Sequence, residues 1–223
     1  MPTPQTVHPE ARTSATTYNG RLRLAGGVGT LLLLTACGGG DGKGGASTGT
    51  GSGLVRVHYT LTGHSDGGMS RSEIDTILDL THGRSRTTYV SSDDHSAVGT
   101  WFVWDGSALL THMPGNPPQY TRTEKANLEP GMTQGFDLRP GTAAFTTACA
   151  GGRRLGTQTI LNRSAVRYAC PKTESQQSSR AAHELALDQA MGFLLKDSGT
   201  DFTMVATKIT LNPPVTTDTF STK

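Results

Sequence analysis

The sequence predicts a mainly β protein, built around a single large, curved antiparallel sheet of about ten strands. Apolar and polar residues alternate from Leu54 onward, and turn signals recur roughly every 10–15 residues. No apolar pattern of helical period lasts longer than about two turns. Charged residues make up 17% of the chain and aromatic residues 6%, which argues against a coiled coil or a long helical bundle.

The first strand shows the clearest period of two. Val55, Val57, Tyr59 and Leu61 alternate with polar residues, and the Gly-rich segment 63–68 predicts the turn that follows. Further strands are expected at Ile74–Leu80, Arg84–Val90, Thr100–Trp104, Ala108–His112, Thr142–Ala148, Gln158–Leu161, Ala165–Ala169, His183–Leu187, Phe193–Lys196 and Phe202–Leu211. Because apolar residues change phase within the last of these strands, we expect either a bulge there or a strand buried on both faces.

Turn and breaker residues separate these strands. His82–Gly83 and Gly151–Gly152 predict turns, and Asp105–Gly106 predicts a hairpin with a type I′ turn. Pro114–Pro118 interrupts the chain, and Glu124–Leu128 is expected to form one helical turn.

Residues 1–36 are expected to be an export signal rather than part of the fold. Arg21 and Arg23 precede the apolar run Leu24–Leu34, which is too short to span a bilayer core of about 30 Å. The run ends in Leu34–Cys37, which resembles the lipobox of bacterial lipoproteins. That resemblance implies a lipidated Cys37; the alternative is an ordinary signal peptide with a chance cysteine.

The segment before Arg21 is longer than usual for such a signal, and a start codon assigned too far upstream would explain it. Residues 37–53 are predicted to form the lipidated cysteine and a flexible tether, since 38–53 holds nine glycines and no large apolar residue. The remaining residues, 54–223, form the expected domain.

The charge of the chain lies mostly outside this domain. Four of the 20 basic and two of the 18 acidic residues precede Leu54, so the domain is formally neutral. A neutral domain lacks the electrostatic footprint of a nucleic-acid-binding protein.

Two cysteines remain in the exported domain. Cys149 and Cys170 are expected to form a disulfide, which is stable outside the cytoplasm; two free thiols are the alternative. The odd cysteine count is then explained by Cys37 as the anchor.

The sequence indicates neither an enzyme nor a cofactor or metal site. No two histidines lie two to four residues apart, and the cysteines are too far apart for a zinc ribbon. The acidic cluster Asp93–Asp94–His95 is best interpreted as solvated loop charges. A hydrolase would need His95 or His183 to meet an acid and a nucleophile in a cleft.

The apolar positions suggest instead a curled sheet with an internal cavity, because the sequence offers few helices to cover its inner face. For any one of these side chains, a place in an ordinary packed core is the favoured alternative. The candidates to line the cavity are Tyr59, Leu78, Trp101, Val103, Leu187, Phe193 and Met204.

Three segments resemble motifs of the lipoprotein-carrier superfamily that includes LolA, LolB, RseB (MucB) and LppX. They are the hairpin Trp104–Pro114, the strand pair His183–Lys196, and the terminal strand Ile209–Val215 with Phe220. Met191 stands where the family usually has Thr before Gly, and the Cys149–Cys170 pair is not part of the general pattern.

The resemblance implies an open half-barrel of about ten to eleven strands, with short helices over a concave face that accepts acyl chains. Its members carry lipoproteins, transport lipids, or sense lipids and signal to a partner. We therefore expect a protein anchored to the outer face of the cell membrane that binds lipid or a lipidated protein without catalysis. The alternative is a signalling module of RseB type that binds an envelope regulatory protein without carrying lipid.

Overall fold

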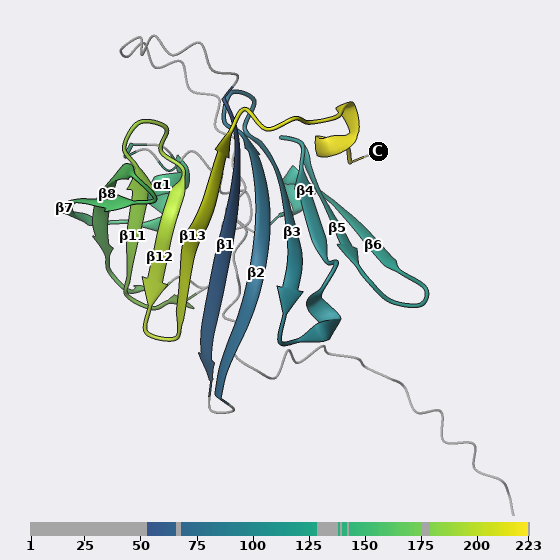
Figure 1. Ribbon diagram of the computed structural model, residues 1–223, viewed down its shortest axis with the longest axis horizontal. Helices are drawn as coiled ribbons and strands as arrows, with labels where there is room; N and C mark the ends of the chain where they lie inside the picture. Colours follow the sequence, from purple (N-terminus) through teal and green to yellow (C-terminus); the bar gives the residue numbers. More distant parts are fainter. Residues whose placement is uncertain are drawn as a thin grey trace, which may run out of the picture.

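The computed structural model describes residues 53–65, 68–128, 138, 140–141, 143–174 and 179–222. Eleven strands form one antiparallel sheet in the order β6-β5-β4-β3-β2-β1-β13-β12-β11-β8-β7, and β9 and β10 form a separate pair. Figure 1 shows the sheet as one twisted layer with β6 and β7 at its edges. The predicted fold class, a single antiparallel sheet with little helix, is therefore confirmed.

The strands are β1 (Leu54–Ser65), β2 (Gly68–Asp79), β3 (Arg84–Ser92), β4 (Trp101–Trp104), β5 (Ala108–Met113), β6 (Gln119–Glu124), β7 (Arg153–Ile160), β8 (Arg163–Cys170), β9 (Thr173–Glu174), β10 (Ser179–Arg180), β11 (His183–Asp188), β12 (Leu194–Gly199) and β13 (Phe202–Leu211). The helical elements are η1 (His95–Ala97), η2 (Lys125–Asn127), α1 (Ala143–Ala148) and η3 (Thr217–Phe220).

The alternation in β1 defines the two faces of the sheet. Val55, Val57, Tyr59 and Leu61 are all buried and point to one side, which we call the inner face. The intervening side chains point to the opposite, outer face, because successive residues of a strand alternate. β1 continues to Ser65, beyond the predicted start of the turn at residue 63.

A bulge in the β1–β13 pair explains the phase change predicted in the last strand. His58 pairs with Lys208 but Tyr59 pairs with Ala206, so Thr207 is the extra residue. The hydroxyl of Thr207 donates to the carbonyl of His58 over 3.2 Å. The bulge lets both halves of β13 keep an apolar side chain toward the core.

One predicted strand is a helix in the structure, and one strand of the structure was not predicted. Thr142–Ala148 was expected as a strand, but residues 143–148 form the helix α1. Short apolar runs do not distinguish helix from strand by period, and the alanines of this run favour a helix. Strand β6 was not predicted, because its residues are polar apart from Tyr120 and carry no apolar alternation.

The Asp105–Gly106 hairpin forms as predicted, pairing Trp104 with Leu109, but its turn is not type I′. Only Gly106 has a positive φ, of 98°, whereas type I′ needs positive values at both central residues. The Asp105 carboxylate instead accepts hydrogen bonds from the backbone N–H groups of Ser107 and Ala108 at 2.7 and 2.9 Å.

The C-terminal segment returns to the outer face of the sheet near β3–β6 (Figure 1). Arg84 lies 4.9 Å from the centre of the Phe220 ring, and Phe220 is buried. Arg122 donates to the carbonyl and the hydroxyl of Thr222, each over 2.6 Å, and that hydroxyl donates to Asp105. Partial burial opposes ionisation of Asp105, but its hydrogen bonds from Thr222, Ser107 and Ala108 outweigh this and lower its pKa to about 2.

A disulfide joins Cys149, just after α1, to Cys170 at the end of β8. The predicted bond is thus present, with a Cα–Cα distance of 4.8 Å. The predicted signal, Cys37 and the tether up to residue 52 lie outside the described residues. Among the described helices, none is both long and apolar enough to cross a membrane.

Candidate functional site

The inner face carries a continuous buried apolar cluster that extends from Tyr89 on β3 to Tyr168 on β8. Val55, Val57 and Leu78 have no exposed surface at all. The cluster therefore spans most of the width of the sheet and is the largest apolar feature of the described chain.

Four of the seven side chains proposed to line a cavity share this inner face. Tyr59 and Leu78 lie on β1 and β2, and Met204 and Leu187 lie on β13 and β11. All four belong to the buried cluster. Phe193, which directly precedes β12, belongs to it as well and is fully buried.

The register places the other two candidates on the outer face. Val103 on β4 pairs with Arg86 on β3, and the register continues from Arg86 through Ile77 to Arg56, an outer-face residue of β1. Trp101 lies two residues before Val103 on the same strand, paired with Thr88. Directly paired residues share a face, so Trp101 and Val103 point away from the inner-face cluster. The seven residues consequently do not form one lining.

The helix α1 covers only one end of the inner face. Its Phe145 packs edge-on against Tyr168 at a centroid distance of 4.9 Å, and the disulfide fixes the end of the helix to β8. A six-residue helix is about 9 Å long, whereas the seven strands from β3 to β8, spaced about 4.8 Å apart, span about 29 Å. Most of the apolar face therefore lies beyond the reach of α1, and Leu138, from the segment before α1, is a fully buried member of the same cluster.

Tyr59 carries a buried hydroxyl within this apolar region. Its hydroxyl donates to the carbonyl of Leu194 on β12 over 2.8 Å, reaching across β13. Burial raises the pKa of Tyr59, so the phenol stays protonated and keeps this bond. Tyr89 is buried as well, which raises its pKa to about 12.

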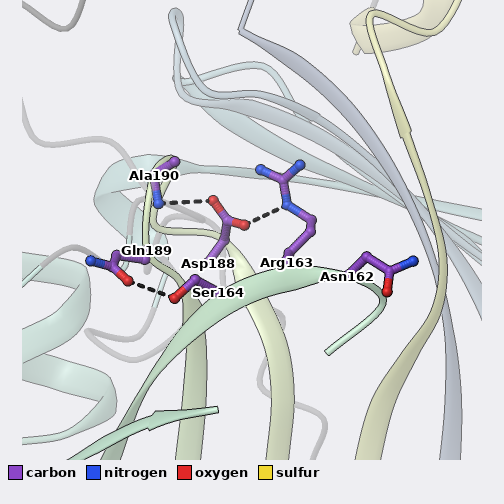
Figure 2. A pocket seen from close by; sticks show the side chains of 6 residues that line it. All are labelled: Asn162, Arg163, Ser164, Asp188, Gln189 and Ala190. Carbon is purple, nitrogen blue, oxygen red and sulfur yellow. Dashed lines mark hydrogen bonds and ion pairs between the residues drawn. The ribbon is translucent and has the colours of Figure 1, made fainter. Parts of the chain in front are cut away.

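A polar pocket of about 420 Å³ adjoins the cluster at one end of β8 and β11 (Figure 2). Two turns form it: the β7–β8 turn, where Leu161 and Asn162 have φ of 49° and 60°, and the turn after Asp188. Leu161, predicted in a strand, thus belongs to the turn. The residues that line the pocket are Asn162, Arg163, Ser164, Asp188, Gln189 and Ala190.

Asp188 holds the second turn in place. Its buried carboxylate accepts the backbone N–H groups of Ala190 and Met191 at 3.1 and 2.8 Å, and it pairs with Nε of Arg163. Gly192 completes the turn with a φ of 77°. The Asp and Gly of the motif noted at His183–Lys196 therefore have a structural role in this hairpin.

Arg163 lies between the pocket and Phe193 of the apolar cluster. Its guanidinium lies 5.5 Å from the centre of the Phe193 ring, and Figure 2 shows Nε pointing to Asp188 and the two terminal nitrogens pointing away from it. Ser164 donates to the side-chain oxygen of Gln189 over 2.6 Å. Sequence reasoning missed this pocket, because only pairing of β8 with β11 brings its two turns together.

The acidic cluster has loop-building roles. Asp93 accepts the backbone N–H of Arg71 at 2.7 Å, and Asp94 caps η1 by accepting the N–H of Ser96 at 3.0 Å. Hydrogen bonds from Ser96 lower the pKa of Asp94. Within the described part of the chain, no three His, Cys, Asp or Glu side chains are placed to hold a metal ion.

The sequence matches no protein-family profile and no curated protein. Among solved structures, the chain resembles an uncharacterized conserved protein from Thermus thermophilus, with 12% identity, a TM-score of 0.49, and coverage of 76% of this chain and 84% of that one. It also resembles MucB in the Pseudomonas aeruginosa MucA/MucB complex, with 16% identity, a TM-score of 0.45, and coverage of 76% and 56%. The chain thus spans little more than half of MucB.

A LolA superfamily protein from Nitrosomonas europaea matches with 12% identity, a TM-score of 0.37, and coverage of 76% of this chain and 90% of that one. The Mycobacterium tuberculosis lipoprotein LppX is a further structural neighbour. The structural neighbours of this chain therefore include LolA-superfamily, MucB and LppX proteins, the classes that its sequence motifs resemble.

Proposed function

We propose that this chain is a membrane-anchored lipoprotein whose sheet binds an acyl chain of a lipid, or of a lipidated protein, against its inner face without catalysing a reaction. The observation that carries the proposal is the width of the apolar cluster. It extends from β3 to β8, whereas α1 reaches only the β8 end. Acyl chains are flexible and apolar, so they can enter between the side chains of such a face at little polar cost.

The polar pocket would bind a polar group at the end of β8 and β11, on the side of the sheet opposite Leu187, because Asp188 and its neighbour Arg163 alternate with the inner-face residues. Arg163 offers its two terminal nitrogens there, and Asn162 and Gln189 offer amide groups. Phe193 lies beneath the guanidinium and belongs to the apolar cluster.

Anchoring would come from Cys37. The lipobox-like Leu34–Cys37 and the Gly-rich tether lead into the start of β1. A tether of sixteen residues has an average reach of roughly 20–24 Å, which would keep the domain close to the membrane surface. The Cys149–Cys170 disulfide supports a location outside the cytoplasm.

The proposal is tested by extracting the natively purified full chain with organic solvent and identifying the lipids by mass spectrometry. We expect a lipid in near-stoichiometric amount, reduced several-fold in Met204→Gln, which places a polar group on the inner face. Tyr120→Ser, on the exposed outer face, is the matched control and should retain the lipid.

Absence of lipid from a folded, purified chain would contradict the proposal. So would recovery of one stoichiometric envelope protein that stays bound after delipidation, because that result favours the signalling-module alternative.

A further inference from the structure

Strand β6 is at one edge of the sheet, and no other described strand pairs with its outer side. The N–H of Lys125 donates to the carbonyl of Ser107, so these two residues are a hydrogen-bonded pair. Such pairs recur at every second residue of an antiparallel ladder, and the β5–β6 register continues without a shift. The backbone groups of Tyr120, Arg122 and Glu124 therefore point away from β5, and among the described strands none pairs with them.

The outer face of the same edge carries a ladder of stacked side chains. Arg86 lies 4.9 Å from the centre of the Trp101 ring, and His112 stacks on Trp101 at 5.2 Å with an angle of 15°. Tyr120 follows 4.8 Å from His112, at the end of the ladder. Tyr120 is 63% exposed, an unusual state for a large aromatic side chain on a strand.

The stacked side chains indicate what kind of molecule could bind beside β6. Arg86 on β3 and His112 on β5 engage Trp101 from its two sides, so Trp101 offers no free ring face for a sugar or another flat ligand. The ladder can grow only beyond Tyr120, by a side chain on an added strand about 5 Å away. A bilayer cannot supply the backbone partners that this edge needs, whereas a strand can.

The side chains and backbone groups along β6 can pair with those of β6 in a second copy of the chain. If two β6 strands pair in antiparallel fashion, only residues whose backbone groups point away from β5 can form hydrogen-bonded pairs between the copies. Tyr120, Arg122 and Glu124 must therefore each face a residue of the same alternating set in the other copy. A twofold axis at Arg122 would place like charges directly opposite, which is destabilising. An axis at Thr123 would place Arg122 opposite Glu124, but it would also place Tyr120 opposite Ala126, where η2 has already left the sheet, so the ladder could not continue into the second copy.

The third arrangement avoids like charges and keeps Tyr120, the exposed end of the ladder, inside the junction. With the axis at Thr121, Tyr120 of each copy faces Arg122 of the other, repeating the cation–aromatic contact at the far end of the ladder. Glu124 then faces Pro118, which lacks an N–H but can accept the N–H of Glu124 through its carbonyl. We propose that two copies of this chain associate through their β6 strands in this register, forming one continuous sheet across the pair.

Sedimentation velocity on the full chain carrying Cys37→Ala, so that no lipid drives association, tests the proposal. A junction of two short strands buries less surface than a standard stable interface, so we expect a weak dimer that increases with concentration over roughly 10–500 µM. Tyr120→Pro removes the ring and one outward N–H while keeping the bonds to β5, and it should be monomeric throughout. Met69→Ser, which removes an apolar side chain that is 71% exposed on β2, should still dimerise.

Disulfide trapping in the same background tests the register. The two copies of Thr121 would form a non-hydrogen-bonded pair with Cα atoms about 4.5 Å apart, within the range that a disulfide can bridge. Thr121→Cys should therefore give a covalent dimer under mild oxidation, and Thr123→Cys should give several-fold less. A chain that stays monomeric at the highest concentration, or crosslinking only through Thr123→Cys, would overturn the proposal.

Discussion

Removing the Cys149–Cys170 disulfide provides a quantitative test of how the domain is held together. The bond closes a loop with a sequence separation of 21 residues, and the chain-entropy relation gives about 3.3 kcal/mol for a loop of that length. Both sulfur atoms lie in nearly inaccessible positions, with 2% exposure at each cysteine. We choose the double variant Cys149→Ala/Cys170→Ala, because serine would add the separate cost of a buried hydroxyl.

The expected result is a lower melting temperature of the full chain, measured by circular dichroism. A domain of this size loses roughly 2–4 °C per kcal/mol, so we expect Tm to fall by about 7–13 °C. The amide protons of α1 should also exchange faster, because the bond fixes the end of this helix to β8.

A reducing agent provides the control. It should lower the Tm of the unmodified chain to that of the double variant and leave the variant unchanged. A double variant that melts within about 2 °C of the unmodified chain would refute the reasoning, since the bond would then contribute little to stability.

Three further changes test other contacts. Asp105 has its pKa lowered to about 2, so its contribution to stability is complete above its ordinary value of about 4 and is lost as the pH falls from 4 to 2. The Tm of Asp105→Asn should therefore fall less than the Tm of the unmodified chain over that pH range. Equal falls in Tm would contradict the lowered pKa of Asp105. Asp188→Ala leaves the partly buried Arg163 unpaired and should cost about 3–5 kcal/mol in urea unfolding; a cost below about 1 kcal/mol would contradict the role of Asp188 in the turn. Cys37→Ser should release the folded chain from the membrane fraction, and its recovery in the membrane pellet would count against lipidation.

Local patterns predicted the parts of the fold that depend on near neighbours. The alternation from Val55 to Leu61 requires only that one face of a strand be buried, and it identified β1. The hairpin at Asp105–Gly106 was likewise predicted, because adjacent strands joined by a short loop pair with each other. The Cys149–Cys170 bond followed from the small number of cysteines.

Features that depend on distant pairing were not predictable. The faces of Trp101 and Val103 are set by the β3–β4 register, and the C-terminal segment that contacts the outer face through Phe220 is more than 100 residues away in the chain. The pocket at Arg163 requires β8 to pair with β11. Polar composition concealed β6, since an edge strand needs no apolar alternation to form.

Photo-crosslinking tests most directly whether the inner face of the sheet binds acyl chains. The full chain would be loaded with a phospholipid that carries a diazirine on its acyl chain, irradiated, and mapped by peptide mass spectrometry. We predict adducts on inner-face residues such as Tyr59, Leu187 and Met204, with none on Trp101 or Tyr120. Adducts confined to the outer face, or no adducts above those of an unrelated exported protein, would contradict the account.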